Sequence, residues 1–270
     1  MKQPDILKPG ATKQQLSILF SDIAGFTTMS EGMDSDDLAK LMNNYFEAAV
    51  GKCIHKTEGT VVKFIGDAIF AIWNAPEKQE DHADRACRGA ILLRDQIGDF
   101  VGGKGKAIRT RIGLHMGDAN VGNFGSSTRI DYTAIGENIN LASRMEGLNK
   151  YMGTDILITG NVKDAVGERF ITRLCGLVRL KGFEKKAVAV HELINVPEKA
   201  EATRAWREAY AAAYEEFKKK NFTAAKEGFQ KVLEMKPKDG PSQFHLNFLE
   251  EVKLDELPEN WQGEIEMHEK

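Results

Sequence analysis

The stretch Leu16–Thr27, LSILFSDIAGFT, is the part of this sequence that best indicates its fold. It begins with a short apolar run, ILF at positions 18–20, which is typical of a buried strand. Asp22 ends that run, and an acid at the end of a buried strand is costly unless something positive lies against it. The segment Gly25–Thr27 follows before a helical pattern begins.

A second stretch, Thr60–Trp73, repeats this arrangement. Its apolar runs flank the pair Gly66-Asp67, which predicts a hairpin with an acid at its tip. Asp22 and Asp67 at the ends of neighbouring strands would form a site for hard divalent cations. Taken singly, Asp67 is equally consistent with a turn residue and Asp22 with a helix cap. The two together, with Lys63 four residues before Asp67, favour the metal site.

Composition places the chain among ordinary globular proteins. The 270 residues are 42% hydrophobic and 29% charged, with a formal net charge of −3, which predicts one large unit plus a small appendage. The basic field typical of nucleic-acid binding is absent, and no apolar run approaches the roughly 20 residues of a transmembrane helix. Three widely spaced cysteines and a polar N-terminus without a signal-peptide pattern favour a cytoplasmic protein with reduced thiols.

The order of elements predicts an α+β fold. Helical and strand patterns alternate irregularly around the central hairpin, which indicates a ferredoxin-like or palm-type α/β sandwich and not a doubly wound parallel sheet. The expected helices span about 34–56, 81–97, 137–151 and 161–166, and the expected further strands 107–117, 129–135, 155–159, 170–181 and 186–194. We expect a long Gly-rich excursion between 117 and 135, and an antiparallel pair of strands joined across Gly182.

The two ends of the chain differ from this core. Residues 1–15 are predicted to be a flexible lead-in, residues 16–196 the main domain, and residues 197–270 a small all-α tail. Trp206–Asp239 fits one 34-residue tetratricopeptide unit, although a plain helical hairpin is nearly as consistent. One such unit cannot bury its own apolar face, so it should dock on the main domain or on a partner, such as a regulatory domain or protein.

Four segments of the chain resemble the four signatures of the class III adenylate/guanylate cyclase catalytic domain, in the family's order. They are FSDIAGFT at 20–27, KFIGD at 63–67, RIGLHMG at 111–117 and NINLASRM at 138–145, and the resemblance extends roughly from Leu16 to Leu193. It implies cyclisation of a nucleoside triphosphate, with the ribose 3′-oxygen attacking the α-phosphorus and pyrophosphate leaving.

The resemblance also implies a role for each matching residue. Two divalent cations, Mg²⁺ or Mn²⁺, would be held by Asp22, Asp67 and the carbonyl of Ile23. The polyphosphate would meet the helix-opening amides of Gly25, Phe26 and Thr27 and the side chain of Arg111. Arg111 is otherwise consistent with a solvated strand arginine.

The fourth signature carries the remaining chemistry. Asn140 and Arg144 stand four residues apart, so they share one face of a helix and can reach one substrate. By resemblance, Asn140 orients the ribose and Arg144 stabilises the transition state. Because the family's site lies between two subunits and this chain carries both residue sets, the resemblance implies a homodimer with two equivalent sites.

The same resemblance implies that Lys63 and Thr133 read the purine, and this pair of residues favours ATP. Lys63 suits adenine, whose N1 accepts a hydrogen bond, and the hydroxyl of Thr133 can accept one from the 6-amino group. A lysine and a threonine at these positions resemble a subgroup often stimulated by bicarbonate. The apolar walls for the base would be Phe20, Ile65 and Ile139.

The favoured hypothesis is therefore an adenylate cyclase that makes cyclic AMP for signal transduction. A guanylate cyclase is the second enzyme hypothesis, although Lys63 would face the N1–H donor of guanine. A catalytically degenerate module that binds nucleotide is the alternative from another class. A diguanylate cyclase or polymerase palm shares the paired acids but does not account for Asn140 and Arg144.

Overall fold

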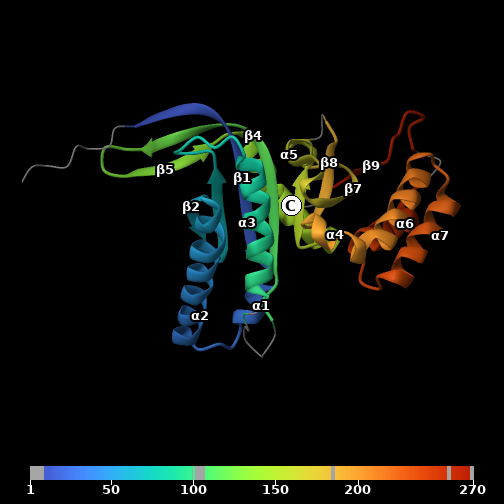
Figure 1. Ribbon diagram of the computed structural model, residues 1–270, viewed down its shortest axis with the longest axis horizontal. Helices are drawn as coiled ribbons and strands as arrows, with labels where there is room; N and C mark the ends of the chain where they lie inside the picture. The colour runs from blue at the N-terminus through green and yellow to red at the C-terminus, as the bar shows by residue number, and fades with distance from the viewer. Residues whose placement is uncertain (1–8, 99, 101–106, 184–185, 254–256, 268–270) are drawn as a thin grey trace, which may run out of the picture. The chain divides into compact units, whose positions relative to one another are not determined.

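The computed structural model describes residues 9–98, 100, 107–183, 186–253 and 257–267 (Figure 1). The chain forms two compact units, Met1–Glu146 and Gly147–Lys270. Each is described by itself.

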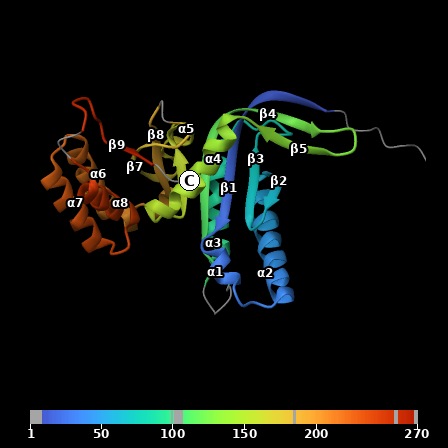
Figure 2. The ribbon, with the colours of Figure 1, turned by 180° about the vertical axis from the view of Figure 1, so that it is seen from behind.

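The first unit is built on an antiparallel sheet whose strands follow the order β2-β3-β1-β4, with β5 also paired to β4. Figure 2 shows β1 lying between β3 and β4. The central strand β1 pairs with β4 over its whole length and with β3 over its second half. The five strands are β1 Gly10–Ile23, β2 Thr60–Ile65, β3 Ala68–Trp73, β4 Thr110–Gly125 and β5 Ile130–Ile135.

Most helices of this unit begin and end close to their predicted positions. The side chain of Asp34 caps α2 by accepting a hydrogen bond from the amide of Asp36 at 2.9 Å. The α-helix ends at Glu47 and continues as a π-helix and a short 3₁₀ turn before the hairpin. The helices are α1 Phe26–Ser30, α2 Ser35–Glu47, the π-helix Ala48–Ile54, the 3₁₀ turn His55–Thr57, α3 His82–Ile97 and α4 Glu137–Met152.

Side chains alternate along a strand, so β1 presents side chains on two faces of the sheet. Both of these faces are covered by helices. Ser17 faces α3, where its hydroxyl bonds Nδ1 of His82 at 2.8 Å. The opposite face carries Leu16 and Ile18, which pack in one apolar cluster with Ile139 and Ala142 of α4. Asp22 also lies on this second face. The helix α4 therefore covers the side of the sheet that carries this predicted metal ligand.

Two sequence predictions for this unit are corrected. Residues 10–15 belong to β1 and not to a flexible lead-in, because they pair residue by residue with the far half of β4, from Gly10 opposite Asn123 to Gln15 opposite Asp118. Residues 1–8 lie outside the described part of the chain. The predicted excursion after Gly117 is instead the continuation of β4 to Gly125, which turns back into β5 as a hairpin.

Within the described residues, the second unit combines a small sheet with four α-helices of its own. Its strands follow the order β6-β8-β7-β9, and the predicted antiparallel pairing of β7 with β8 is confirmed. The tail helices break near Asn221 and Pro237, as predicted, and the three-residue β9 is a strand that sequence analysis missed. The elements are β6 Ile156–Thr159, α5 Gly160–Val166, β7 Ile171–Arg179, β8 Val188–Asn195, α6 Glu201–Lys218, α7 Phe222–Met235, α8 Gly240–Glu251 and β9 Glu264–Glu266.

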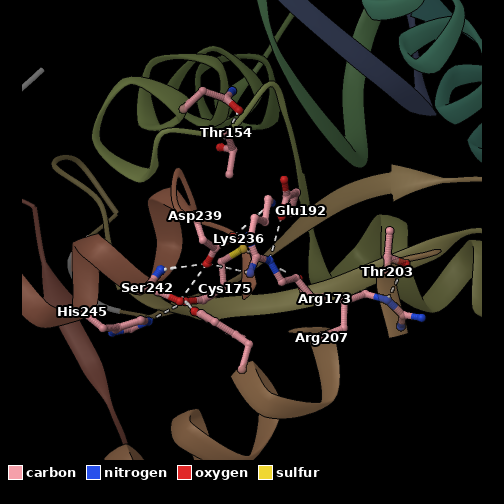
Figure 3. A network of polar contacts seen from close by, with 12 residues as sticks. Thr154, Arg173, Cys175, Glu192, Thr203, Arg207, Lys236, Asp239, Ser242 and His245 are labelled. Atoms are coloured by element: carbon pink, nitrogen blue, oxygen red, sulfur yellow. Dashed lines mark hydrogen bonds and ion pairs between the residues drawn. The ribbon is translucent and has the colours of Figure 1, made fainter. Parts of the chain in front are cut away.

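A buried arginine fastens the tail helices to this sheet (Figure 3). Arg173 of β7 donates to Glu192 of β8 at 2.7 Å and forms a bidentate pair with Asp239, at 2.6 and 2.9 Å, before α8. Its guanidinium carbon lies 4.7 and 4.6 Å from the ring centroids of Trp206 and Tyr210 in α6. The side chain of Arg173 is 4% exposed and that of Asp239 is fully buried, so both charges depend on their partners.

The apolar faces of the tail helices are buried in the same place. Leu174 of β7 packs against a cluster that contains Tyr210, Phe217, Phe229 and Trp261. The tail therefore docks on a strand of the main domain, one of the two outcomes expected for an isolated helical pair. For this reason the division between compact units does not coincide with the predicted boundary at 196/197. The tetratricopeptide likeness of the tail stays a prediction.

The Arg173–Asp239 pair predicts how the stability of the protein depends on pH. Burial alone would raise the pKa of Asp239, but Arg173 and its neighbours lower it to about 2. An unfolded aspartate has a pKa near 3.9, so the stabilisation is present above about pH 4 and is lost as the pH falls toward 2. We expect Asp239→Asn to lower the free energy of unfolding at pH 7 by about 2 to 3 kcal/mol.

Urea unfolding between pH 7 and pH 3 measures this effect. The difference between wild type and Asp239→Asn should shrink as the pH falls, whereas Glu227→Gln, at an exposed position of α7, should match wild type throughout. Equal stability of Asp239→Asn and wild type at pH 7 would contradict the role of the pair.

Candidate active site

The two predicted metal acids lie together at one end of the first unit's sheet. Asp22 is the next-to-last residue of β1, and Asp67 lies in the turn between β2 and β3 after Gly66, whose φ of 64° suits glycine. The amide of Ile23 donates to Oδ2 of Asp67 at 3.1 Å, which ties the hairpin tip to the end of β1. The carboxyl groups of Asp22 and Asp67 are themselves within hydrogen-bonding reach of each other.

This closeness perturbs the protonation of the pair. Burial, then the charge of Asp67 and a hydrogen bond with it, raise the pKa of Asp22 to about 6, although Arg111 opposes the rise. The two carboxylates are held together despite their repulsion, and the carbonyl of Ile23 directly follows Asp22 in the chain. These groups supply the oxygen donors that hard divalent cations prefer. These residues fit a divalent cation. Among the described residues, no group of three or more His, Cys, Asp or Glu is placed to hold a metal ion.

The residues expected to meet the polyphosphate follow directly. Gly25 adopts a left-handed conformation, with φ of 70°, immediately before α1. Gly25, Phe26 and Thr27 thus occupy the first turn of a helix, where backbone amides lack intrahelical acceptors. Arg111 lies on β4 directly opposite Asp22 of β1.

Residues of the third signature form the surface of β4 on which α4 packs. Gly113 is two residues from Arg111 and therefore on the same face of β4, and a Cβ there would collide with backbone atoms of α4 at Ala142, Met145 and Glu146. Further along β4, Nε2 of His115 bonds Oδ1 of Asn138 at 2.8 Å. The alternation of Arg, Gly and His thus lets the helix backbone approach the strand and fixes the helix start.

The geometry of α4 separates the two predicted residue sets. At about 100° per residue, Asn140 and Arg144 lie on the side of α4 opposite Ala142, which faces β4. Asn140 is exposed and Arg144 half-buried, while Ala142 and Met145 are buried. The structure therefore gathers Asp22, Asp67 and Arg111, and directs Asn140 and Arg144 away from β4.

The residues expected to read the purine come from several strands. Lys63 and Ile65 are exposed on β2, and Thr133 is half-buried on β5, opposite Gly122 of β4. Phe20 stacks on Phe70 with ring centroids 4.6 Å apart. The predicted wall residue Ile139 is 8% exposed and belongs to the apolar cluster under α4, so little of its surface is open within one chain.

Sequence reasoning missed one acid at this site, Glu146 of α4. Burial, then the charge of Asp22, raises the pKa of Glu146 to about 7, with Arg111 opposing and Asp67 adding to the rise. Its position was available from helical periodicity, since it lies within about 40° of Ala142 on the helix surface. It lies just outside the fourth signature, and a single acid on a helix is usually solvent-facing, so nothing in the sequence singled it out.

Comparison with known proteins assigns the family. Residues 9–195 match the model of the adenylate and guanylate cyclase catalytic domain. The chain belongs to this family of nucleotide cyclase domains. Within the described residues, no helix is long and apolar enough to cross a membrane.

The relatives include both kinds of cyclase. Over 72% of this chain, the sequence is 34% identical to adenylate cyclase 1 of Rhizobium meliloti, and over 68% of this chain it is 36% identical to the adenylate cyclase of Anabaena cylindrica. The matching regions span only 30% and 37% of the lengths of those two relatives. Among solved structures, the adenylyl cyclase CyaB from P. aeruginosa superposes with a TM-score of 0.62 at 30% identity, covering 69% of this chain and 97% of that one. The guanylate cyclase domain of RhGC from Catenaria anguillulae, in complex with GTP, has the same TM-score at 27% identity, covering 69% of this chain and all of that one.

Proposed function

We propose that this protein is an adenylate cyclase that converts ATP to 3′,5′-cyclic AMP and pyrophosphate. The observation that carries the proposal is the pairing of Asp22 and Asp67 beside Arg111, on a chain whose α4 presents Asn140 and Arg144. The adenylate cyclases of Rhizobium meliloti and Anabaena cylindrica support the choice of reaction.

Two divalent cations, Mg²⁺ or Mn²⁺, would supply activation of the attacking 3′-oxygen and neutralisation of charge on the polyphosphate. Asp22, Asp67 and the carbonyl of Ile23 would hold them. Arg111 and the amides of Gly25–Thr27 would orient the polyphosphate from the same chain. Arg144 would place a fixed positive charge where negative charge develops, and Asn140 would hold the ribose for in-line attack.

Two copies of the chain would complete each site. Asn140 and Arg144 lie on the face of α4 turned away from β4, so they suit a substrate held by another subunit's acids. A two-fold dimer would then contain two equivalent sites, each taking its acids from one chain and Asn140 with Arg144 from the other. The exposed apolar residues Phe64, Ile65 and Ile135 of this unit support burial of part of its surface against a partner.

Lys63 carries the preference for adenine in this proposal. Its ammonium is a donor only, so it matches the N1 acceptor of adenine and opposes the N1–H donor of guanine. The second candidate is a guanylate cyclase, which is favoured by structural relatives such as the RhGC domain bound to GTP.

Product analysis separates these functions. Purified protein incubated with Mn²⁺ and equal concentrations of ATP or GTP should form cyclic AMP faster than cyclic GMP. Faster formation of cyclic GMP would favour the second candidate. Absence of both products from a folded, dimeric protein would indicate a degenerate module.

The purine-reading pair gives a graded prediction. A neutral hydrogen bond contributes about 0.5–1.5 kcal/mol and one to a charged group about 1.5–3 kcal/mol. Thr133→Ala should therefore lower kcat/KM for ATP only several-fold, and Lys63→Ala should lower it more. Lys63→Glu with Thr133→Cys should shift the preference toward GTP. A loss with Thr133→Ala as large as that expected for Asp22→Ala would mean that Thr133 supports the backbone of the site.

A further inference from the structure

The second unit contains a cavity of about 400 Å³ that is lined by residues of α5, the sheet and α6. Its volume lies in the range of small-molecule binding sites. Three side chains that can donate hydrogen bonds line it, each from a different element: Lys163 of α5, His191 of β8 and Arg207 of α6. All three are half-buried. The cavity therefore collects donors from three separate parts of the fold.

Arg207 is held in place by groups at the start of α6. Its Nε donates to Oγ1 of Thr203 at 3.0 Å, and its Nη2 donates to the carbonyl of Ala200 at 3.4 Å (Figure 3). Among the described residues, no carboxylate pairs with this guanidinium and Nη1 has no partner. A guanidinium whose plane is held and whose outer donors are unused is suited to binding two oxygens of an anion.

Lys163 is paired with an acid that an anion can replace. Its Nζ donates to the carbonyl of Gly167 at 2.8 Å and to Oε1 of Glu168 at 3.0 Å. The side chain of Glu168 is 97% exposed, so this ion pair contributes little stability. Within the described part of the chain, Glu168 is also the one acid that lines the cavity. When an anion takes its place at Lys163, the lining has an excess of positive charge.

His191 adds a neutral donor. Burial, then the charge of Lys163, lower the pKa of His191 to about 4, although Asp164 opposes the change, so the ring is uncharged at pH 7. Its Nδ1 is buried and has no hydrogen-bond partner among the residues that the structure describes. A buried N–H without an acceptor is rarely tolerated, so the ring proton belongs on Nε2. Nε2 is thus the nitrogen through which this ring can donate into the cavity.

We propose that this cavity binds the phosphate group of a small phosphomonoester. Arg207 would bind two phosphate oxygens, and Lys163 and Nε2 of His191 would donate to the same group. A phosphate alone is much smaller than the cavity, so the remaining wall, which includes the half-buried Leu174, would meet the organic part of the ligand. None of these residues belongs to the candidate active site, so the inference is independent of the proposed function.

Such a ligand would also connect the tail to the main domain. Arg207 belongs to the tail helix α6, whereas Lys163 and His191 precede the predicted boundary at 196/197. A ligand held by all three residues binds only the docked arrangement. Binding should therefore raise the thermal unfolding midpoint of the protein.

The test is isothermal titration calorimetry of the full chain with phenyl phosphate, a phosphomonoester with an apolar ring. Wild type should bind it saturably, with a Kd of about 1 mM or tighter. Arg207→Ala should raise this Kd about tenfold or more and Lys163→Ala several-fold, because each removes a charge-assisted hydrogen bond. Arg204→Ala should match wild type. Arg204 is the matched control, because it is an exposed cation of α6 that pairs with Glu201 at 2.8 Å.

Two changes at His191 test its role as a donor. His191→Gln keeps an N–H donor, whereas His191→Phe keeps only the size of the ring, so the glutamine variant should bind phenyl phosphate more tightly. Equal Kd values for these two folded variants would overturn the role of His191. If either variant does not fold, Arg207→Ala and Lys163→Ala, which change half-buried side chains on helices, decide the inference.

Four results would contradict the inference. Absence of saturable binding to wild type would overturn it, as would equal weakening by Arg204→Ala and Arg207→Ala, which would indicate a diffuse attraction to α6. Loss of binding with Arg111→Ala but not with Arg207→Ala would assign the ligand to the candidate active site. Inorganic phosphate that binds as tightly as phenyl phosphate would overturn the choice of a phosphomonoester.

Discussion

Replacing Asp22 or Asp67 by alanine is expected to reduce cyclic nucleotide formation about 10³-fold or more, without unfolding the protein. Either change leaves a single carboxylate where two are needed to hold the cations that neutralise the negative charge of the triphosphate. The fold should tolerate the loss, since the two acids repel each other and burial already raises the pKa of Asp22 to about 6.

The measurement is the initial rate with ATP and saturating Mn²⁺, read beside the thermal unfolding midpoint. Asp37→Ala is the matched control, because Asp37 is an exposed acid of α2 remote in sequence from both signatures. We expect the control to keep the wild-type rate and all three variants to unfold within a few degrees of wild type. Near-normal turnover by Asp22→Ala or Asp67→Ala would remove the basis for a site with two cations.

Much of the fold was predictable from local pattern. The hairpin 60–73 and helix α3 have strong periodicity and clear turn signals, and the structure has them within a residue of their predicted ends. The outer halves of β1 and β4 could not be predicted in this way. Residues 10–15 are polar, and they form strand only because they pair with residues more than a hundred positions later in the sequence. Such pairing leaves no hydrophobic alternation to detect.

The residues of the candidate site also differ in whether local sequence pattern or a tertiary contact determines their position. The paired acids, Arg111 and the Asn140–Arg144 face are short-range features, and the structure brings the first three together. The position of Glu146 depends on how closely α4 approaches Gly113, which is a tertiary contact. Arg173 and Asp239 likewise stand 66 residues apart, and neither residue type predicts a buried pair.

In the proposed dimer, each active site would take its acids from one chain and its transition-state arginine from the other. Mixing Asp22→Ala with Arg144→Ala tests this sharing of residues. Both proteins should be inactive alone, because every site in either homodimer lacks an essential group. A mixed dimer has one site without both groups and one site with neither change, so it should regain activity.

After subunit exchange at equal concentrations, random pairing makes about half of the dimers mixed, and each has one intact site of two. We therefore expect about a quarter of the wild-type specific activity. Exchange is verified independently, for example by copurification of a tagged with an untagged chain. Confirmed exchange with no recovery of cyclic AMP formation would show that the acids and Arg144 act within one chain, and would contradict a site shared between two chains.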